Sequence, residues 1–459
     1  MESKYMVVIS FDAVSSEDIE VLKNLPNFKK LIENGSWIKR VDSIYPTLTY
    51  PAHTTIVTGK YPNNHRIIDN TIFKVGDFVP NWYWYRNKIK GQTLYDLAME
   101  KGLTTCSLLW PVTGKAKITY NMPEIFAVKP YQHQLFMSAG AGTLGFQLDI
   151  NKRFGNLRKG IEQPYLDNFV IEAAKYTIKK YAPNLMLIHF TDVDTNRHHY
   201  GYRNNVIDDA FIRHDKRLGE IIDALKERGI YDECTIVALG DHSHLDASKV
   251  IKLNALFRKE GLIKINEKGK VLDYKSICKS LDGSCYIYLK DKNDTETMEK
   301  IKSLIADLPI DFILEGNEIR DAGGDEEASF MIEASLDYYF VDDIYGEVID
   351  EINKWTEIIV KDTDCAKVKL EGYVERFSVL ADLITKIGSF IELSISVNTK
   401  DDEALKYSDI LEDNSTLHLL KYLQNRYGNL QLCDIEDNKS INNLCDHIEK
   451  EGQILDLVV

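Results

Sequence analysis

Short apolar runs alternate with amphipathic stretches along the first 240 residues. Runs without a polar face predict buried strands, and apolar residues that recur every three or four positions predict helices. The predicted strands are Val7–Phe11, Thr104–Leu109, Leu185–Phe190 and Thr235–Leu239. The predicted helices are Glu17–Asn34, which Pro26 divides in two, Leu94–Lys101, Asn168–Tyr181 and Ile207–Arg228. The alternation indicates a layered α/β fold with a mostly parallel central sheet and helices on both of its faces.

The pattern changes near residue 345. Acidic and polar residues are frequent from Asp350 to Asp364, which is typical of a linker. Beyond it, residues 365–459 repeat the alternation of strands and helices on a smaller scale. We therefore predict a main domain over residues 1–348 and a small α/β accessory module over 365–459. The alternative is that 365–459 form a heavily altered end of the main domain.

The composition is that of a folded, acidic chain. Of its 459 residues, 44% are hydrophobic and 28% are charged, close to globular averages. The net charge of −15 argues against a nucleic-acid polymer as partner, because such binding relies on basic patches. The charge permits a small phosphate ester as substrate, since bound metal ions reverse the local charge.

Targeting and redox features predict a cytoplasmic protein. The chain begins directly with an apolar strand, without the basic and long apolar regions of a secretory signal. No run approaches the roughly 20 apolar residues of a membrane span, so we expect no membrane association. The seven cysteines are odd in number and scattered, which favours reduced thiols over a disulfide framework.

Four short segments concentrate residues that suit divalent-metal chemistry on phosphate esters. They are Phe11-Asp12-Ala13, Thr47–His53, Asp194–His198 and Gly240-Asp241-His242. Together they supply carboxylates, imidazoles and a hydroxyl nucleophile. Three of the four follow the ends of predicted strands, where open α/β sheets place their ligand sites.

Each segment also has an ordinary structural interpretation. Asp12 suits a helix cap as well as a metal ligand, and the threonine-rich segment suits a capping turn as well as a nucleophile. Asp194 and His198 are four residues apart, so one helical turn would aim both at one ion, a pair suited to Zn²⁺, although most such pairs are surface charges. The co-occurrence of all four segments favours the metal site. The minor candidates nearby are His189, Asp192, His199, His244 and Asp246.

With these residues, the chain resembles the alkaline phosphatase superfamily, and most of all its type I phosphodiesterase / nucleotide pyrophosphatase branch. The resemblance covers roughly residues 5 to 345. It is carried by Val8–Ala13, Tyr45–Pro62, His65–Asn70, Asp194–Tyr200 and Leu239–His242. The threonine-rich block and its continuation through Thr58-Gly59-Lys60-Tyr61-Pro62 are the most specific part. An alkaline phosphatase-like fold is therefore expected.

The resemblance implies a role for each matched residue. Thr49 would be the nucleophile, and the amide of Asn70 would hold a non-bridging phosphate oxygen. Asp194 and His198 would belong to a second zinc and the remaining ligands to the first. The implied metal ligands are Asp12, Thr49, Asp194, His198, Asp241 and His242. The implied reaction is an in-line displacement through a phospho-threonine intermediate, with two divalent ions, Zn²⁺ by preference, as cofactors.

The chain departs from the family at the second zinc, which takes a further ligand from a late His-Gly motif. After His242 the chain has only His244, His418 and His447. His418 and His447 both fall in predicted helices, and neither precedes a glycine. Three outcomes stay open for the second site: weaker metal binding, a substitute carboxylate, or no metal.

Three functional hypotheses follow. The first is a metal-dependent hydrolase of phosphodiester or pyrophosphate bonds, or of a phosphomonoester, in a small-molecule substrate. The second is a catalytically impaired binding or regulatory protein on the same scaffold, motivated by the missing late histidine. A phosphomutase or phosphotransferase ranks third, because the threonine-rich block fits the phosphodiesterase branch better. The aromatic run Asn81–Arg86 either lines the substrate mouth or packs a loop over the core.

Overall fold

The computed structural model describes residues 3–351, except 78, 130, 267 and 268, and three strands beyond them. The chain divides into two units, Met1–Asp350 and Glu351–Val459. In the second unit, β15 (Leu393–Val397) pairs antiparallel with β16 (Leu405–Tyr407) and with β17 (Leu430–Cys433). The rest of the predicted accessory module, including its helices, lies outside the described residues, and the module stays a prediction.

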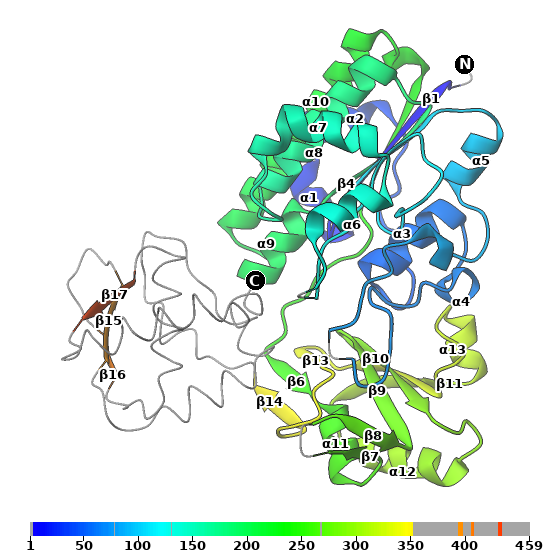
Figure 1. Cartoon of the computed structure of the whole chain (residues 1–459), viewed down its shortest axis with the longest axis vertical. Coiled ribbons are helices and arrows are strands. Elements are labelled where there is room, and N and C mark those ends of the chain that lie inside the picture. The colour runs from blue at the N-terminus through cyan, green and yellow to red at the C-terminus, as the bar shows by residue number, and fades with distance from the viewer. Residues whose placement is uncertain are drawn as a thin grey trace. The chain divides into compact units, whose positions relative to one another are not determined.

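A parallel sheet of five strands forms the centre of the first unit, in the order β3-β2-β4-β1-β5 (Figure 1). The strands are β1 (Tyr5–Phe11), β2 (Thr105–Leu108), β3 (Tyr120–Met122), β4 (Leu185–Phe190) and β5 (Cys234–Leu239). All four strands predicted from apolar runs are present, and only the short edge strand β3 was not predicted. The predicted α/β class with a parallel central sheet is confirmed.

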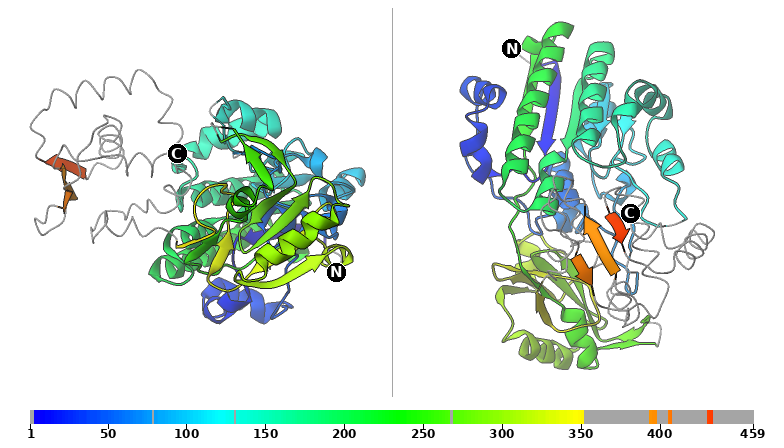
Figure 2. Two further views of the ribbon diagram at one scale, coloured as in Figure 1. Left: turned by 90° about the horizontal axis from the view of Figure 1, so that it is seen from below. Right: turned by 90° about the vertical axis from the view of Figure 1, so that its left-hand side faces the viewer.

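Helices cover both faces of this sheet because the side chains of β1 alternate between them. Val7, Ile9 and Phe11 join the core beneath α8 (Tyr165–Tyr181) and α10 (Asn205–Arg228). Val8 joins the opposite core, with residues of α3 (Thr49–Thr58) and α5 (Leu94–Glu100). Figures 1 and 2 show the two helical layers on either side of the strands.

The ends of several helices around the central sheet follow local sequence signals. Pro26 divides the first helical stretch as predicted, since α1 ends at Leu22 and proline occupies the first position of the next helix. Gly229 ends α10 in the left-handed conformation, with φ of 76°. The other helices are α1 (Ile19–Leu22), α2 (Pro26–Asn34), α4 (Pro62–His65), α6 (Gln134–Ala141), α7 (Leu144–Phe154) and α9 (Asp192–Tyr200).

A second, antiparallel sheet follows β5 and was not predicted. Its strand order is β11-β12-β10-β9, and it packs on a separate apolar core (Figure 1). The turn Asp282-Gly283 joins β9 to β10, with Asp282 at φ of 64°, and such a pair between apolar runs is a hairpin signal. Two smaller sheets, β13-β6-β14 and β7-β8, also belong to this part of the chain. The elements that follow β5 are β6 (Lys249–Ile251), α11 (Leu253–Lys259), β7 (Ile263–Ile265), β8 (Val271–Tyr274), β9 (Ser276–Leu281), β10 (Ser284–Leu289), α12 (Thr295–Ile305), β11 (Ile310–Glu315), α13 (Asn317–Asp321), β12 (Phe330–Ala334), β13 (Tyr338–Phe340) and β14 (Ile349–Glu351).

The structure describes four of the cysteine side chains. Cys106, Cys278 and Cys285 are buried free thiols, and Cys234 is a half-buried one. Within the described part of the chain, no helix has both the length and the apolar character that a membrane crossing requires.

One histidine of α10, His214, points into the core of the first unit. His214 is 0% exposed, its ring lies 4.8 Å from the ring of Phe11, and its Nδ1 accepts a hydrogen bond of 3.3 Å from Arg217. Burial and the positive charge of Arg217 lower the pKa of His214 to about 3. The unfolded chain takes up this proton near pH 6.5, whereas the folded chain does not.

We therefore expect His214 to make the fold acid-sensitive. Between pH 7 and pH 5 it should remove about 2 kcal/mol from the free energy of unfolding, since the unfolded state binds more protons there. His214→Gln keeps an acceptor for Arg217 without a titrating group. Urea unfolding at both pH values should show the stability gap between wild type and variant narrowing by that amount as the pH falls. A gap that stays constant would contradict the assignment.

Candidate active site

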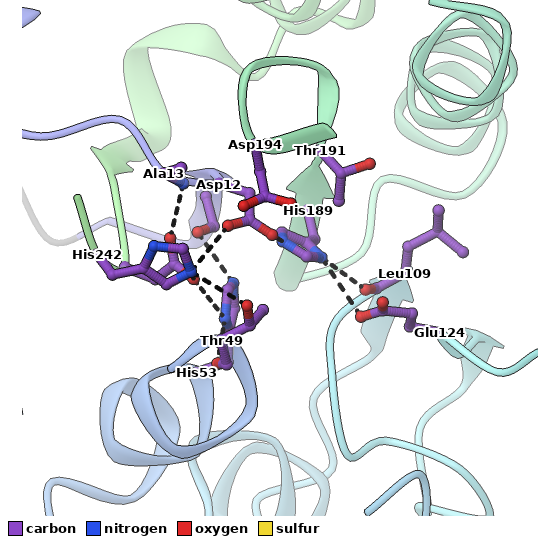
Figure 3. Close-up of polar contacts among 12 residues, drawn as sticks. Asp12, Ala13, Thr49, His53, Leu109, Glu124, His189, Thr191, Asp194 and His242 are labelled. Carbon is purple, nitrogen blue, oxygen red and sulfur yellow. Dashed lines mark hydrogen bonds and ion pairs between the residues drawn. The ribbon is translucent and has the colours of Figure 1, made fainter. Parts of the chain in front are cut away.

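The chemical segments meet at one edge of the central sheet. β4, β1 and β5 are neighbours, and their register aligns Phe11 with Phe190 and Ser10 with Leu239. The strands therefore end at one level, and the polar residues that follow them lie together at their carboxyl ends. Figure 3 shows Asp12, Asp194 and His242 converging there from separate elements.

Thr49 enters this edge as the first residue of α3. Leu48 precedes the helix in an extended conformation, Pro51 is tolerated in its first turn, and Gly59 ends it at φ of 63°. The Thr49 hydroxyl thus lies at the positive end of the helix dipole, where negative charge is stabilised. Its Oγ1 is 3.1 Å from Nε2 of His242. Figure 3 draws this contact as a dashed line.

Two carboxylates surround the same imidazole nitrogen. Nε2 of His242 lies 3.3 Å from Oδ1 of Asp12 and 3.4 Å from Oδ2 of Asp241. Both of these oxygens are buried, and neither has a hydrogen-bond partner among the described residues. Buried carboxylate oxygens are ordinarily paired, so two unpaired ones beside an imidazole and a hydroxyl suit the ligand set of a divalent cation.

Gly240 allows the close approach that places Asp241 in the site. A Cβ at this position would lie 1.7 Å from the carbonyl oxygen of Val14, so a side chain is excluded. The turn after β5 therefore packs directly on the turn after β1. The backbone N–H of Ala13 donates to Oδ1 of Asp241 at 3.1 Å, which leaves Oδ2 turned toward His242.

Charge is concentrated at this edge. Burial and the neighbouring Asp194 carboxylate raise the pKa of Asp12, and burial and Asp12 raise that of Asp241. Burial works against protonation of His242, but the Asp241 and Asp12 carboxylates outweigh it and raise its pKa to about 9. A cation bound at this edge would compete with a proton on His242.

A second group of ligands lies beside the first. Oδ1 of Asp194 is 3.4 Å from Nε2 of His198, one turn later on α9. The ligand atoms of Asp194, His198 and His244 all lie within 4.8 Å of one another, and so do those of Asp12, Asp194 and His242. Asp194 therefore lies between the two groups. Sequence reasoning ranked His244 low because nothing local distinguishes it from a loop histidine.

Two buried histidines support the site: His189, a minor candidate from the sequence, and His53, to which the sequence analysis gave no separate role. His189, near the end of β4, approaches Oδ2 of Asp12 at 3.0 Å. His53, one turn after Thr49 on α3, contacts the Thr49 carbonyl oxygen at 2.8 Å and Oγ of Ser10 at 3.0 Å. The sequence offered one signal for them, a polar residue inside an otherwise apolar strand. Ser10 in β1 and His189 in β4 are such residues, and the two are paired across the strands.

The remaining candidates divide between the site and the scaffold. Oδ1 of Asn70 accepts the N–H of Tyr50 at 2.9 Å, which fixes the amide beside the start of α3. Asp192 belongs instead to a buried ion-pair network, with bonds of 2.7 Å to Arg213 and to Arg217. Trp84 of the aromatic run is 2% exposed, so this residue packs over the core rather than lining a mouth.

Comparisons with known proteins identify the family and the fold. A family model described as type I phosphodiesterase / nucleotide pyrophosphatase matches residues 6–349. Venom phosphodiesterase 2 of Crotalus adamanteus is 28% identical over 247 residues, which are 52% of this chain and 27% of that protein. Ectonucleotide pyrophosphatase/phosphodiesterase family member 1 of Homo sapiens is 26% identical over 267 residues, 55% of this chain and 25% of that protein. The chain thus spans about a quarter of the length of these curated relatives.

The fold has a counterpart among solved structures. Murine ectonucleotide pyrophosphatase / phosphodiesterase 5, in an inactive form in complex with AMP, superposes with a TM-score of 0.50 at 15% identity. The match covers 76% of this chain and 84% of that one, which shows a shared fold. Since the family model covers most of the sequence, this chain belongs to the type I phosphodiesterase / nucleotide pyrophosphatase family, as the motifs predicted.

Proposed function

We propose that the chain is a metal-dependent hydrolase of phosphodiester or pyrophosphate bonds in small molecules. The observation that carries the proposal is the position of the Thr49 hydroxyl. It lies at the start of α3, 3.1 Å from Nε2 of His242, beside two buried carboxylate oxygens that have no hydrogen-bond partner among the described residues. An alcohol in such a place is set up to become a nucleophile.

The residues present fit two divalent ions. Asp12, Thr49, Asp241 and His242 would hold one, and Asp194 and His198 would contribute to the second, with Zn²⁺ favoured by the mixture of imidazole and carboxylate. Bound ions of this kind lower the pKa of a coordinated hydroxyl and neutralise charge on a phosphate.

The chain's own residues supply the remaining chemistry. Thr49 Oγ1 gives up its proton to solvent and attacks phosphorus in line. The bond from phosphorus to the departing oxygen breaks with its electron pair on that oxygen, and a phospho-threonine intermediate forms. Water then attacks this intermediate from the vacated side and restores the Thr49 hydroxyl. The start of the α3 dipole and the Asn70 amide, fixed by Tyr50, stabilise the negative charge on the non-bridging oxygens.

The names of the relatives support nucleotides as a substrate class. The curated relatives are named venom phosphodiesterases and a nucleotide pyrophosphatase/phosphodiesterase, and a solved neighbour of the same fold holds AMP. A nucleotide phosphodiester or pyrophosphate is therefore the first substrate to try. The alternative, a binding or regulatory protein without activity, is not favoured, because these relatives are named as enzymes.

Metal removal tests the proposed activity. The full chain should lose hydrolysis of bis(p-nitrophenyl) phosphate and of p-nitrophenyl thymidine monophosphate after dialysis against a chelator. Added Zn²⁺ or Mn²⁺ should restore it by at least about 100-fold over the metal-free rate, because metal acidifies the nucleophile and stabilises the transition state. Release of p-nitrophenol measures both rates. Equal rates with and without metal would refute the metal-dependent mechanism.

A further inference from the structure

Three side chains from two distant segments form the second group of ligands. Asp194 and His198 belong to one turn of α9, whereas His244 belongs to the loop after β5. Their ligand atoms all lie within 4.8 Å of one another. Ligands of one tetrahedral zinc at bond lengths of about 2.1 Å lie roughly 3.4 Å apart, so small rotations of these side chains suffice to close around an ion.

The His244 ring faces the ring of His198. It is half-buried, and it meets the His198 ring at a centroid distance of 4.6 Å with the two planes at 82°. Among the described residues, no hydrogen bond to its ring nitrogens is found. An imidazole without a partner, facing a second imidazole and a carboxylate, matches the neutral nitrogen donors that zinc selects.

The loop that carries His244 is held on both sides. Ser43 Oγ donates to the carbonyl oxygen of Asp241 at 2.7 Å, and the backbone N–H of Tyr202 donates to Oδ1 of Asp246 at 2.8 Å. Tyr202 lies just past the end of α9, and the intervening Gly201 leaves room for the Asp246 carboxylate, which lies 3.2 Å from where a Cβ would be. The contact with Asp246 thus ties the loop to the helix that bears His198.

We propose that His244 is the third protein ligand of the second metal, where the late histidine of the family has no evident counterpart. The assignment rests on the proposed function for the presence of a metal at this edge. Three protein ligands on one ion leave one tetrahedral position for water or substrate, the arrangement of a catalytic rather than a structural zinc. Asp246 is a positioning residue in this account, since it acts through the loop.

Metal binding by the full chain tests the assignment without substrate. After metal removal, titration with Zn²⁺ should show two equivalents bound by wild type. His244→Ala should keep one equivalent and bind the second more than about 100-fold more weakly, because losing a direct ligand costs at least as much as losing a residue that supports one. Asp246→Ala, which removes the acceptor of the Tyr202 N–H, should weaken the second equivalent to a smaller extent.

His199→Ala is the matched control. His199 is an exposed neighbour of His198 on α9, and its Nδ1 bonds to the carbonyl oxygen of Thr195 at 2.6 Å rather than facing the site. This variant should bind both equivalents like wild type. Circular dichroism and melting curves check that each variant is folded, and His244→Gln serves if the alanine variant is not.

A second equivalent that His244→Ala binds as tightly as wild type would overturn the assignment. So would its loss in His418→Ala or His447→Ala while the His244 variants keep it. The two proposals fail separately. If the chain binds two ions and the His244 variants weaken the second, but no phosphate ester is hydrolysed, the assignment of His244 as a ligand holds and the proposed activity is refuted. If hydrolysis depends on metal but the His244 variants bind the second ion like wild type, the proposed activity holds and the assignment of His244 is refuted.

Discussion

Thr49→Ala should lower the turnover of aryl phosphodiesters by about 10⁴-fold or more, since removal of a covalent nucleophile leaves only binding and electrostatic stabilisation. The hydroxyl is the reacting group in the proposed displacement and lies 3.1 Å from His242. Steady-state release of p-nitrophenol at saturating metal measures the loss. Thr49→Ser should retain part of the activity, because it keeps the oxygen at the first position of α3.

Thr47→Ala provides the matched control for this prediction. Thr47 belongs to the same threonine-rich segment, but its hydroxyl donates to the carbonyl oxygen of Ile44 at 2.8 Å and takes no part in the site. Its loss should change turnover by less than about tenfold, the effect of one local hydrogen bond. Equal activity in wild type and Thr49→Ala would remove Thr49 from the chemistry.

Arg197→Ala should cost about 3 kcal/mol of folding free energy, because it leaves a buried carboxylate short of its main partner. Arg197 lies on α9 between Asp194 and His198, and its guanidinium is fully buried against Asp18 at 2.7 Å. It also donates to the carbonyl oxygen of Ala13, next to Asp12. Denaturant unfolding measures the cost. The same change should also weaken metal binding, since α9 loses its tie to the turn after β1.

Arg203→Ala separates this effect from a general loss of charge. Arg203 pairs with the same carboxylate of Asp18 at 3.1 Å, but its side chain is 39% exposed. Exposed ion pairs contribute little, so this variant should lose less than about 1 kcal/mol. The remaining Arg203 pair is also why Arg197→Ala is expected at the lower end of the range for broken buried pairs. Equal losses for both variants would contradict the role given to burial.

Four of the five strands of the central sheet were predictable because each lies in a short, largely apolar run, which is a local property of the sequence. β4 covers the predicted range Leu185–Phe190, and β1 and β5 differ from their predictions only at their ends. The antiparallel sheet left a weaker mark, since polar residues interrupt the apolar runs of its strands, as in Ser276–Leu281, and the strands pair with partners chosen by the tertiary structure. The turn Asp282-Gly283 between β9 and β10 is a local hairpin signal for this sheet, but the prediction from sequence did not include the hairpin.

The sequence by itself determined the α/β class, the family and the set of polar residues that follow β1, β4 and β5, because strand periodicity and motif order are properties of the chain in one dimension. Only the tertiary structure decided which of those residues meet. Asp192 joined an arginine network and His244 joined Asp194 and His198. The physical reason is that a loop residue is placed by anchors remote in the chain, here the bond between Tyr202 and Asp246, and no local pattern records such a contact.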